Sequence, residues 1–412
     1  MSNSWMKSLV LVGLSQFLSA AAFCSAYTFM PFYFKEIGVP DDRLSWYVAL
    51  FTAFGTLSFA LAAPVWGVLA DKYGRKLMLL RANFVAALLV PIVGFITNVN
   101  LILIHRIALG AFTGTVPAAQ TLMLGMIPDN KRNFVLGVLT SCFFSGMMVG
   151  QFCGGEVVNR LGFMWTFILS GGILAVAGLL VLPVKENFNR QQPQTEPDPV
   201  TAPQKKNWLK MLDFGKVWYL MLLCSCMTAS RDMDGSFIPV LVDNIMNDNA
   251  AALRWSGYIF GGCSAVAIVM GTVIGWIADR SKMLNILLIL TALSVVMRIP
   301  QILTDSVPAL FVYRCMLAAV ACGIEPLLNS WIAAAVPARD HGRYFGFAGT
   351  FRGLGWSLSS LMGGGVILAC GNEVRSVFAL AAFLMLCMIP LILFVSKRIP
   401  IPDRSKKRNS ST

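Results

Sequence analysis

The chain has 412 residues, of which 57% are hydrophobic and only 13% are charged, and its mean hydropathy is +0.69. An average soluble domain is about 25% charged, so this composition excludes a protein whose whole surface faces water. A formal net charge of +13 would suit a nucleic-acid partner unless the basic residues serve another purpose.

Apolar segments without Asp, Glu, Lys or Arg recur along the whole chain. A bilayer core of about 30 Å needs roughly 20 apolar residues per helix. Six segments precede a hydrophilic interval and six follow it: 8–34, 44–70, 82–105, 107–128, 133–155, 161–184, 217–230, 255–278, 283–297, 315–324, 353–372 and 376–396. The sequence therefore predicts an all-α membrane protein with twelve transmembrane helices.

Lysine and arginine gather in every second connection between these spans. If the N-terminus is cytoplasmic, the cytoplasmic connections hold most of the basic residues, and the other side holds few: Lys35, Arg43, Arg160, Arg254 and Arg375. Cytoplasmic loops of membrane proteins are enriched in Lys and Arg. The basic charge thus predicts cytoplasmic N- and C-termini and no nucleic-acid partner. The short connections and bare termini suit a multi-pass protein of a bacterial inner membrane.

The interval between the sixth and seventh spans is hydrophilic and rich in Pro and Gln, a composition typical of a flexible linker. We predict an N-terminal six-helix bundle at 1–184, a cytoplasmic linker at 185–215, a C-terminal six-helix bundle at 216–396 and a basic cytoplasmic tail at 397–412.

The two predicted bundles repeat each other. Residues 67, 70, 71, 72 and 106 recur 208 positions later as Gly275, Ala278, Asp279, Arg280 and Arg314. With one further residue inserted, the register continues from Pro128, Gly137, Gly146, Gly154 and Gly155 to Pro337, Gly346, Gly355, Gly363 and Gly364. A register kept over two loops and three spans indicates duplication. We therefore expect two pseudo-symmetric bundles.

Several of these residues resemble motifs of the major facilitator superfamily. The loop GVLADKYGRK at 67–76 resembles its signature loop, and Arg106-x-x-x-Gly110 is similar to a second motif. Glycines of the fifth span match the spacing of the antiporter motif in the 12-span drug:proton branch, although Gln151 stands where that motif has Pro. The resemblance implies two bundles rocking about a midplane cavity, lined by the first, fourth, seventh and tenth spans.

The signature loop and its repeat form a predicted conformational latch, made of Gly67, Asp71, Gly74, Arg75 and Asp279. Asp71 ends the second span at the face where the eleventh span begins, and a carboxylate beside a helix N-terminus is stabilised by about 0.3–1 kcal/mol. We expect Asp71 and Asp279 to hold the halves together in the outward-open state. The alternative is a basic turn that only fixes topology.

Glycines in the fifth and eleventh spans form stripes of small residues: Gly146, Gly150 and Gly154, and Gly355, Ser359 and Gly363. Residues four apart lie on one helix face, and small residues let helices approach closely in lipid. We expect these helix-packing glycines to pack the two halves together.

Ionisable residues inside the spans are the candidates for mechanism, because each costs about 2.5–3.5 kcal/mol at a helix centre. The predicted cavity charges are Arg106, Arg231 and Arg314, and the predicted proton-coupling residues are Glu325, Asp234 and Asp232, in that order. Burial raises the pKa of a carboxylate and a nearby cation lowers it, so these groups share one cavity in our prediction. Asp232 is expected to be neutralised by adjacent Arg231. The alternative is a set of static buried ion pairs.

No P-loop, nucleophile–base grouping or metal-ligand spacing occurs in the sequence, which argues against an enzyme, an ATP-driven pump, a metal and a cofactor. We predict proton-coupled efflux of lipophilic or cationic small molecules by a monomer in the lipid bilayer. A sugar or metabolite transporter is the alternative that Gln151 favours. A non-transporting membrane sensor is disfavoured by the buried charges and the lack of an attached signalling domain.

Overall fold

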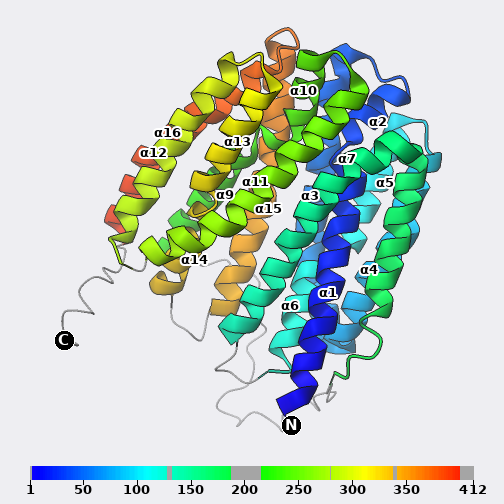
Figure 1. Cartoon of the computed structure of the whole chain (residues 1–412). Coiled ribbons are helices and arrows are strands. Elements are labelled where there is room, and N and C mark those ends of the chain that lie inside the picture. Colours follow the sequence, from blue (N-terminus) through cyan, green and yellow to red (C-terminus); the bar gives the residue numbers. More distant parts are fainter. Residues whose placement is uncertain (1, 128–131, 187–214, 279, 337–340, 400–412) are drawn as a thin grey trace.

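The computed structural model describes residues 2–127, 132–186, 215–278, 280–336 and 341–399. Within these ranges every regular element is a helix (Figure 1). The first half contains α1 (Ser2–Tyr27), α2 (Met30–Glu36), α3 (Asp41–Tyr73), α4 (Arg75–Ile92), η1 (Val93–Phe95), α5 (Val99–Phe112), α6 (Thr115–Leu124) and α7 (Arg132–Leu179). The second contains η4 (Gly215–Val217), α9 (Trp218–Asp232), η5 (Gly235–Phe237), α10 (Ile238–Met246), α11 (Asn249–Ala278), α12 (Met283–Leu303), α13 (Val307–Ala321), α14 (Ile324–Ala335), α15 (His341–Ala369) and α16 (Arg375–Arg398).

Nine helical segments of the described chain are long and apolar enough to cross a membrane. One of them, α7, contains two spans, because Gly162 leaves helical geometry with φ 80° and ψ 168°. Two further passes are the interrupted segment α9–η5–α10 and the 29-residue helix α15. The described residues thus make twelve passes, and the predicted fold of twelve helices is confirmed.

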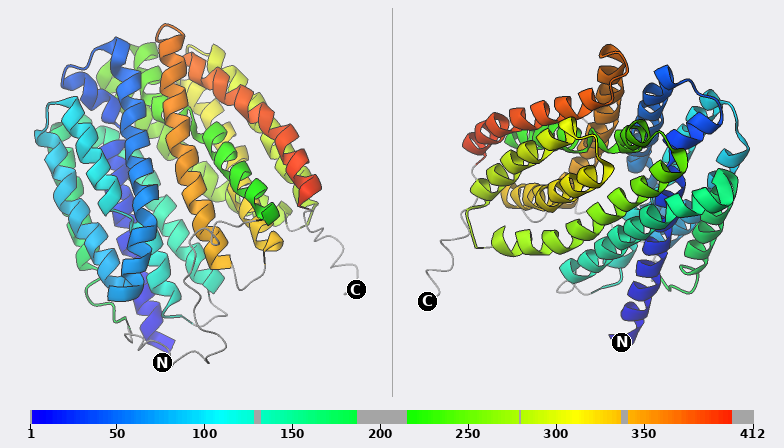
Figure 2. Two further views of the ribbon diagram at one scale, coloured as in Figure 1. Left: turned by 180° about the vertical axis from the view of Figure 1, so that it is seen from behind. Right: turned by 45° about the horizontal axis from the view of Figure 1, so that its top comes forward.

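The helices form two groups that lie side by side, α1–α7 and α9–α16 (Figure 2). The groups meet where α3 packs on α15 and α7 packs on α11. Helix α1 begins and helix α16 ends at one end of the molecule, here called the terminal end, and the other is the α2–α10 end (Figure 1). The predicted linker and tail lie mostly outside the described residues, so the predicted domain boundaries stay predictions.

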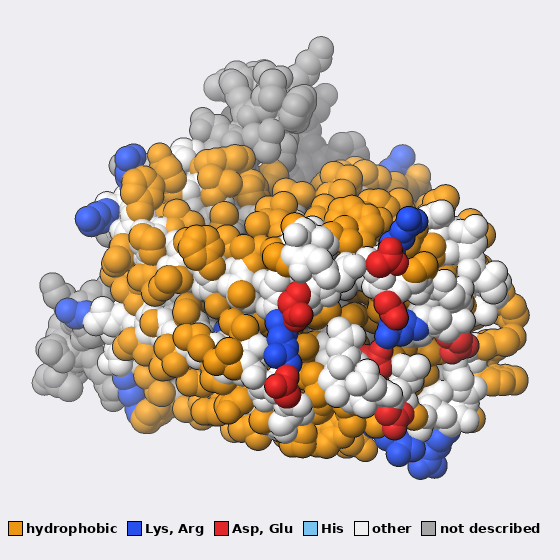
Figure 3. Space-filling view, turned by 90° about the horizontal axis from the view of Figure 1, so that it is seen from above, with side chains coloured by type: hydrophobic (Ala, Val, Ile, Leu, Met, Phe, Trp, Pro, Cys, Tyr) orange, Lys and Arg blue, Asp and Glu red, His pale blue; other side chains and the backbone are white. Residues whose placement is uncertain are grey.

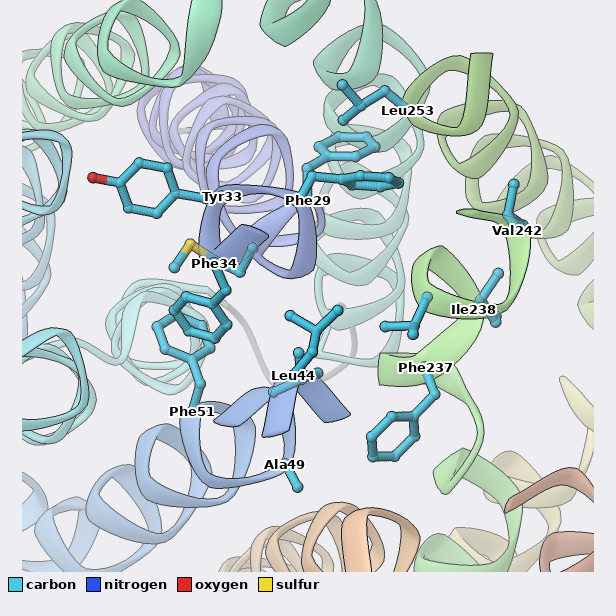
Figure 4. Packing of buried hydrophobic residues seen from close by; sticks show 14 of the residues in the cluster. Phe29, Tyr33, Phe34, Leu44, Ala49, Phe51, Phe237, Ile238, Val242 and Leu253 are labelled. Atoms are coloured by element: carbon cyan, nitrogen blue, oxygen red, sulfur yellow. The ribbon is translucent and has the colours of Figure 1, made fainter. Parts of the chain in front are cut away.

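The buried apolar residues are divided unequally between the two ends. One large cluster near the α2–α10 end joins both halves, with Phe29, Phe34 and Phe51 on one side and Phe237 and Leu253 on the other (Figure 4). The other two clusters each stay within one half and lie nearer the terminal end. Among the described residues, the halves therefore share a buried apolar core at the α2–α10 end and not at the terminal end.

The glycine stripe of α7 lies against α1 and not against the second half. An added Cβ at Gly146, Gly150 or Gly154 would overlap the backbone or side chains of α1. In the same way, Gly355 lies on the carbonyl of Ser225 in α9, and Gly363 lies on Phe237. The expectation that these five glycines pack the halves together is wrong, because each packs two helices of the same half.

The next residue along each helix makes the contact between halves. A Cβ at Gly155 would overlap the carbonyl of Leu253 in α11, and one at Gly364 would overlap the side chain of Ala49 in α3. Successive residues of an α-helix point about 100° apart, so paired glycines serve two interfaces. Gly155 and Gly364 are equivalent in the sequence repeat, and their equivalent contacts show that the repeat is also structural.

Candidate functional site

Asp234 lies at the interruption between α9 and α10, where the helix gives way to η5. Its side chain is buried, with 1% exposed, and it accepts a hydrogen bond from Nη1 of Arg314 at 2.7 Å. Nε of Arg298 lies 3.4 Å from the same oxygen, Oδ2. Arg298 is itself fully buried, and its Nη2 donates to the carbonyl of Arg231 at 2.5 Å. The interrupted helix therefore holds a carboxylate between two arginines on neighbouring helices, as the cost of a buried charge requires.

Glu325 is the second residue of α14, just after the break where α13 ends. One of its carboxylate oxygens lies 3.3 Å from Nη1 of Arg231, and the other lies 3.6 Å from Nη1 of Arg352 in α15. Arg352 also donates to the side chain of Asn329. A third of the Glu325 side chain, 34%, is exposed, whereas Asp234 is enclosed. Solvent thus reaches Glu325 far more readily than Asp234, and about as readily as Asp232, which is 32% exposed.

Asp232 pairs with the arginine beside it in sequence. Nε and Nη2 of Arg231 donate to its two oxygens at 2.8 and 2.9 Å, so the predicted pairing is confirmed. Nε1 of Trp356 donates to Asp232 at 2.7 Å. Arg231 therefore contacts Asp232 and Glu325 together, and one guanidinium joins α9 to α14.

Arg106 is not brought to this network. Its guanidinium lies over Gly55 and beside the rings of Tyr27 and Phe51, at 4.9 and 4.8 Å from their centroids. These contacts are all with the first half, and no carboxylate lies within ion-pair distance of Arg106 in the part of the chain that the structure describes. The structure brings together the other five predicted residues, and the expectation that Arg106 lines the same cavity stays a prediction.

Two ion pairs at the α2–α10 end were not predicted. Lys35 Nζ lies 2.5 Å from Oδ2 of the buried Asp243 and joins α2 to α10. Nearby, Nε of Arg254 in α11 lies 3.0 Å from Glu156 in α7. Figure 3 views this end, where charged side chains lie in small groups on a largely apolar surface. Both pairs cross between the halves. The sequence did contain a signal for the pair of Lys35 and Asp243. The two positions are 208 residues apart and are therefore equivalent in the repeat, yet they carry opposite charges.

The latch residues are only partly described. Asp279 and the side chain of Asp71 lie outside the described residues, so their predicted contacts stay untested. Gly74 has φ 99°, which only glycine adopts without strain. Arg75 donates to the carbonyl of Thr121 at 3.0 Å. The carboxylate of Glu186 caps α4, accepting from the backbone N–H groups of residues 75 and 76 at 3.0 and 2.8 Å.

Comparison with known proteins places these features in a wider group. The sequence model described as "Major Facilitator Superfamily" matches residues 12–304 and 280–412. The chain is 30% identical to the multidrug resistance protein MdtG of Proteus mirabilis, over 92% of this chain and 94% of that protein. It is 25% identical to the multi-drug resistance efflux pump PmrA homolog of Lactococcus lactis, over 88% and 89%.

Two solved structures resemble the fold. The nucleoside transporter NupG matches with a TM-score of 0.73 at 12% identity, covering 95% of this chain and 99% of that one. A bacterial homolog of the human lysosomal transporter Spinster, inward-facing and unoccupied, matches with a TM-score of 0.70 at 14% identity, covering 97% and 98%. At this level of identity the likeness concerns the arrangement of helices.

Proposed function

Since this chain belongs to the Major Facilitator Superfamily, we propose that it exports lipophilic or cationic small molecules by proton-coupled alternating access. The relatives named for multidrug resistance support efflux of small molecules. The observation that carries the coupling is Glu325, a partly exposed carboxylate held between Arg231 and Arg352. The protein acts in this proposal as a monomer with small molecules and protons as its partners.

In this proposal the terminal end faces the cytoplasm of a bacterial cell and the membrane is the inner one. Basic residues of the described connections at that end, such as Lys72, Lys76, Arg280 and Lys282, support this orientation. The structure then corresponds to an inward-facing state, since the described residues of the two halves share a buried core at the α2–α10 end and not at the terminal end.

Glu325 is the proton carrier because solvent reaches its carboxylate and because that carboxylate pairs with two arginines, Arg231 and Arg352. Protonation removes the negative charge that Arg231 and Arg352 share, so Arg231 keeps Asp232 as its carboxylate partner and Arg352 keeps only the amide of Asn329. Arg352 belongs to α15, and the same helix meets α3 in the other half, where Ser357 and Thr56 are 2.7 Å apart. A proton on Glu325 thereby acts on a helix of the interface. Asp234 and Asp232 serve mainly to anchor the arginines around it.

The latch of Asp71 and Asp279 completes the cycle in the outward-facing state. Its glycines support this assignment, because no described residue outside the local helix lies within 4 Å of the place a Cβ would take at Gly67 or Gly275. Glycine at an unpacked position has no use in this state, but it would allow close approach when the terminal end closes.

The sugar-carrier alternative loses its main support. Gln151 accepts a hydrogen bond from Ser264 at 3.2 Å across the interface between α7 and α11. Its amide therefore has a packing partner in the other half. Sugar-driven proton flux without any dye movement would restore that alternative.

The test is transport in liposomes under an imposed pH gradient, with neutral N-phenyl-1-naphthylamine and cationic ethidium as probes. Glu325→Gln should lose gradient-driven dye movement while its melting temperature changes little, because Arg231 keeps Asp232 and Arg352 keeps Asn329 as acceptors. Glu373→Gln, at the α2–α10 end, is the matched control and should transport normally. Gradient-driven movement preserved in Glu325→Gln would contradict the coupling role.

A further inference from the structure

Arg106 and Arg314 occupy equivalent positions of the repeat but have different partners. The register around them can be checked on the structure, since α2 begins at Met30 and α10 begins 208 residues later at Ile238. A proline follows the first residue of both helices. The same offset places Ala26 where the second half has Asp234, the partner of Arg314. The first half therefore keeps the arginine and lacks its carboxylate.

The surroundings of Arg106 are built to hold a guanidinium. Gly55 leaves room for it, since a Cβ there would stand within 3 Å of Nε, Cζ and Nη2. Tyr27 and Phe51 flank it with their rings. Ala26 is buried, with 1% exposed. By the equivalence with Asp234 and Arg314, a methyl group stands at the position from which an in-chain carboxylate would reach Arg106.

Two donors in this place have no acceptor. Nε of Arg106 and the hydroxyl of Tyr27 are buried and make no hydrogen bond in the described chain. Buried polar groups in folded proteins are almost always hydrogen-bonded. Two orphaned donors beside one cation indicate a site for an acceptor that carries negative charge.

We propose that an acidic group of the transported molecule binds Arg106, in the position that Asp234 takes against Arg314. The inference rests on the proposed function and narrows its substrates to lipophilic molecules that carry a carboxylate or sulfonate. The aromatic rings of Tyr27 and Phe51 contact the apolar body beside the acidic group.

The charge balance of the buried groups agrees with this substrate. The network of the second half has more arginines than carboxylates, namely Arg231, Arg298, Arg314 and Arg352 against Asp232, Asp234 and Glu325. Arg106 adds a further positive charge. A site lined by an excess of one sign attracts ligands of the other sign, so an acid is favoured over a cation of similar size.

The test supplies the missing carboxylate from the chain itself. Ala26→Asp should pair with Arg106 and compete with an acidic ligand, whereas Ala26→Asn adds the same bulk without the charge. The probes are 8-anilino-1-naphthalenesulfonate and N-phenyl-1-naphthylamine, which differ by the sulfonate. We expect Ala26→Asp to bind the sulfonate dye at least about tenfold more weakly than Ala26→Asn, the loss of one charge-assisted contact. The neutral dye should bind the two variants equally.

Equal binding of the sulfonate dye to the Asp and Asn variants would overturn the inference, as would an equal loss of both dyes. If Ala26→Asp does not fold, Arg106→Gln against Arg106→Lys provides the same comparison of charge. Transport separates this inference from the proposed function. No gradient-driven movement of either naphthyl dye or of ethidium overturns the efflux proposal. Movement of the neutral dye and ethidium with the sulfonate dye excluded overturns only the acidic substrate.

Discussion

The two ends of the interface between the halves are packed differently. At the α2–α10 end, Gly155 and Gly364 press against the opposite half so closely that a Cβ would overlap it. Toward the terminal end, Gly67, Gly137 and Gly275 have open space where a Cβ would stand. In the proposed transport cycle these three glycines would let the terminal end close, as expected for a carrier with two discrete states.

The largest effect is expected from filling one glycine at each end. Gly155→Leu collides with the carbonyl of Leu253 and should force the α2–α10 end apart. Overpacking costs about 1–3 kcal/mol, so the closed state at this end should lose roughly five- to a hundredfold in population. A Cβ at Gly137 would meet nothing within 4 Å in this state, so Gly137→Leu should instead oppose closure of the terminal end. Both variants should lose efflux.

The two variants should differ in which end stays open. A single cysteine replacing Ser236, whose hydroxyl lies 3.3 Å from that of Thr52 in the other half, reports on the α2–α10 side in a background without other cysteines. An impermeant maleimide added from that side should label it faster in Gly155→Leu and more slowly in Gly137→Leu than in the parent. The same labelling rate in both variants would contradict the comparison of the two ends.

A smaller effect is expected at the ion pair between Lys35 and Asp243. Asp243 is 7% exposed and Lys35 is 24% exposed, so removing the lysine strands a nearly buried carboxylate. Breaking a buried pair costs about 3–5 kcal/mol and an exposed pair up to about 1 kcal/mol; we expect a cost between the two. Lys35→Met should therefore lower the thermal stability of the protein more than Asp243→Asn does.

The exchange Lys35→Asp with Asp243→Lys sharpens that test. It restores opposite charges at positions that the repeat makes equivalent, and it should recover part of the stability lost by either single charge change. If the double exchange lost as much stability as the two single changes added together, the two side chains would contribute independently. Their ion pair would then not stabilise the closed α2–α10 end.

The sequence was sufficient for properties that depend on neighbours along the chain. Apolar length fixed the twelve passes, and adjacency fixed the pairing of Arg231 with Asp232. The sequence could not predict which neighbouring helix each glycine stripe faces. A helix in a bundle has several packed faces, and how it is rotated about its own axis depends on the helices around it. Adjacent Gly154 and Gly155 serve different helices for this reason.

The partners of isolated charges were equally out of reach. Arg298 is recognisable from the sequence as an arginine within a span, but its carboxylate, Asp234, is on another helix. Arg106 is likewise an arginine within a span, but no carboxylate of the described residues pairs with it. A buried charge predicts that a partner is needed, and only the structure tells whether the chain supplies it.

The smallest effect is expected at the exposed pair of Glu156 and Arg254, which also crosses between the halves. Glu156 is shared with Arg160 one turn along its own helix, at 2.6 Å, so removing Arg254 leaves the carboxylate with a partner. Exposed ion pairs contribute little and are screened by salt. Arg254→Gln should therefore change the maleimide labelling rate by less than about twofold, and high salt should remove even that difference. If Arg254→Gln opened the α2–α10 end as strongly as Lys35→Met, closure would depend on the number of charges across the interface, and the burial of Asp243 would not explain the stronger pair.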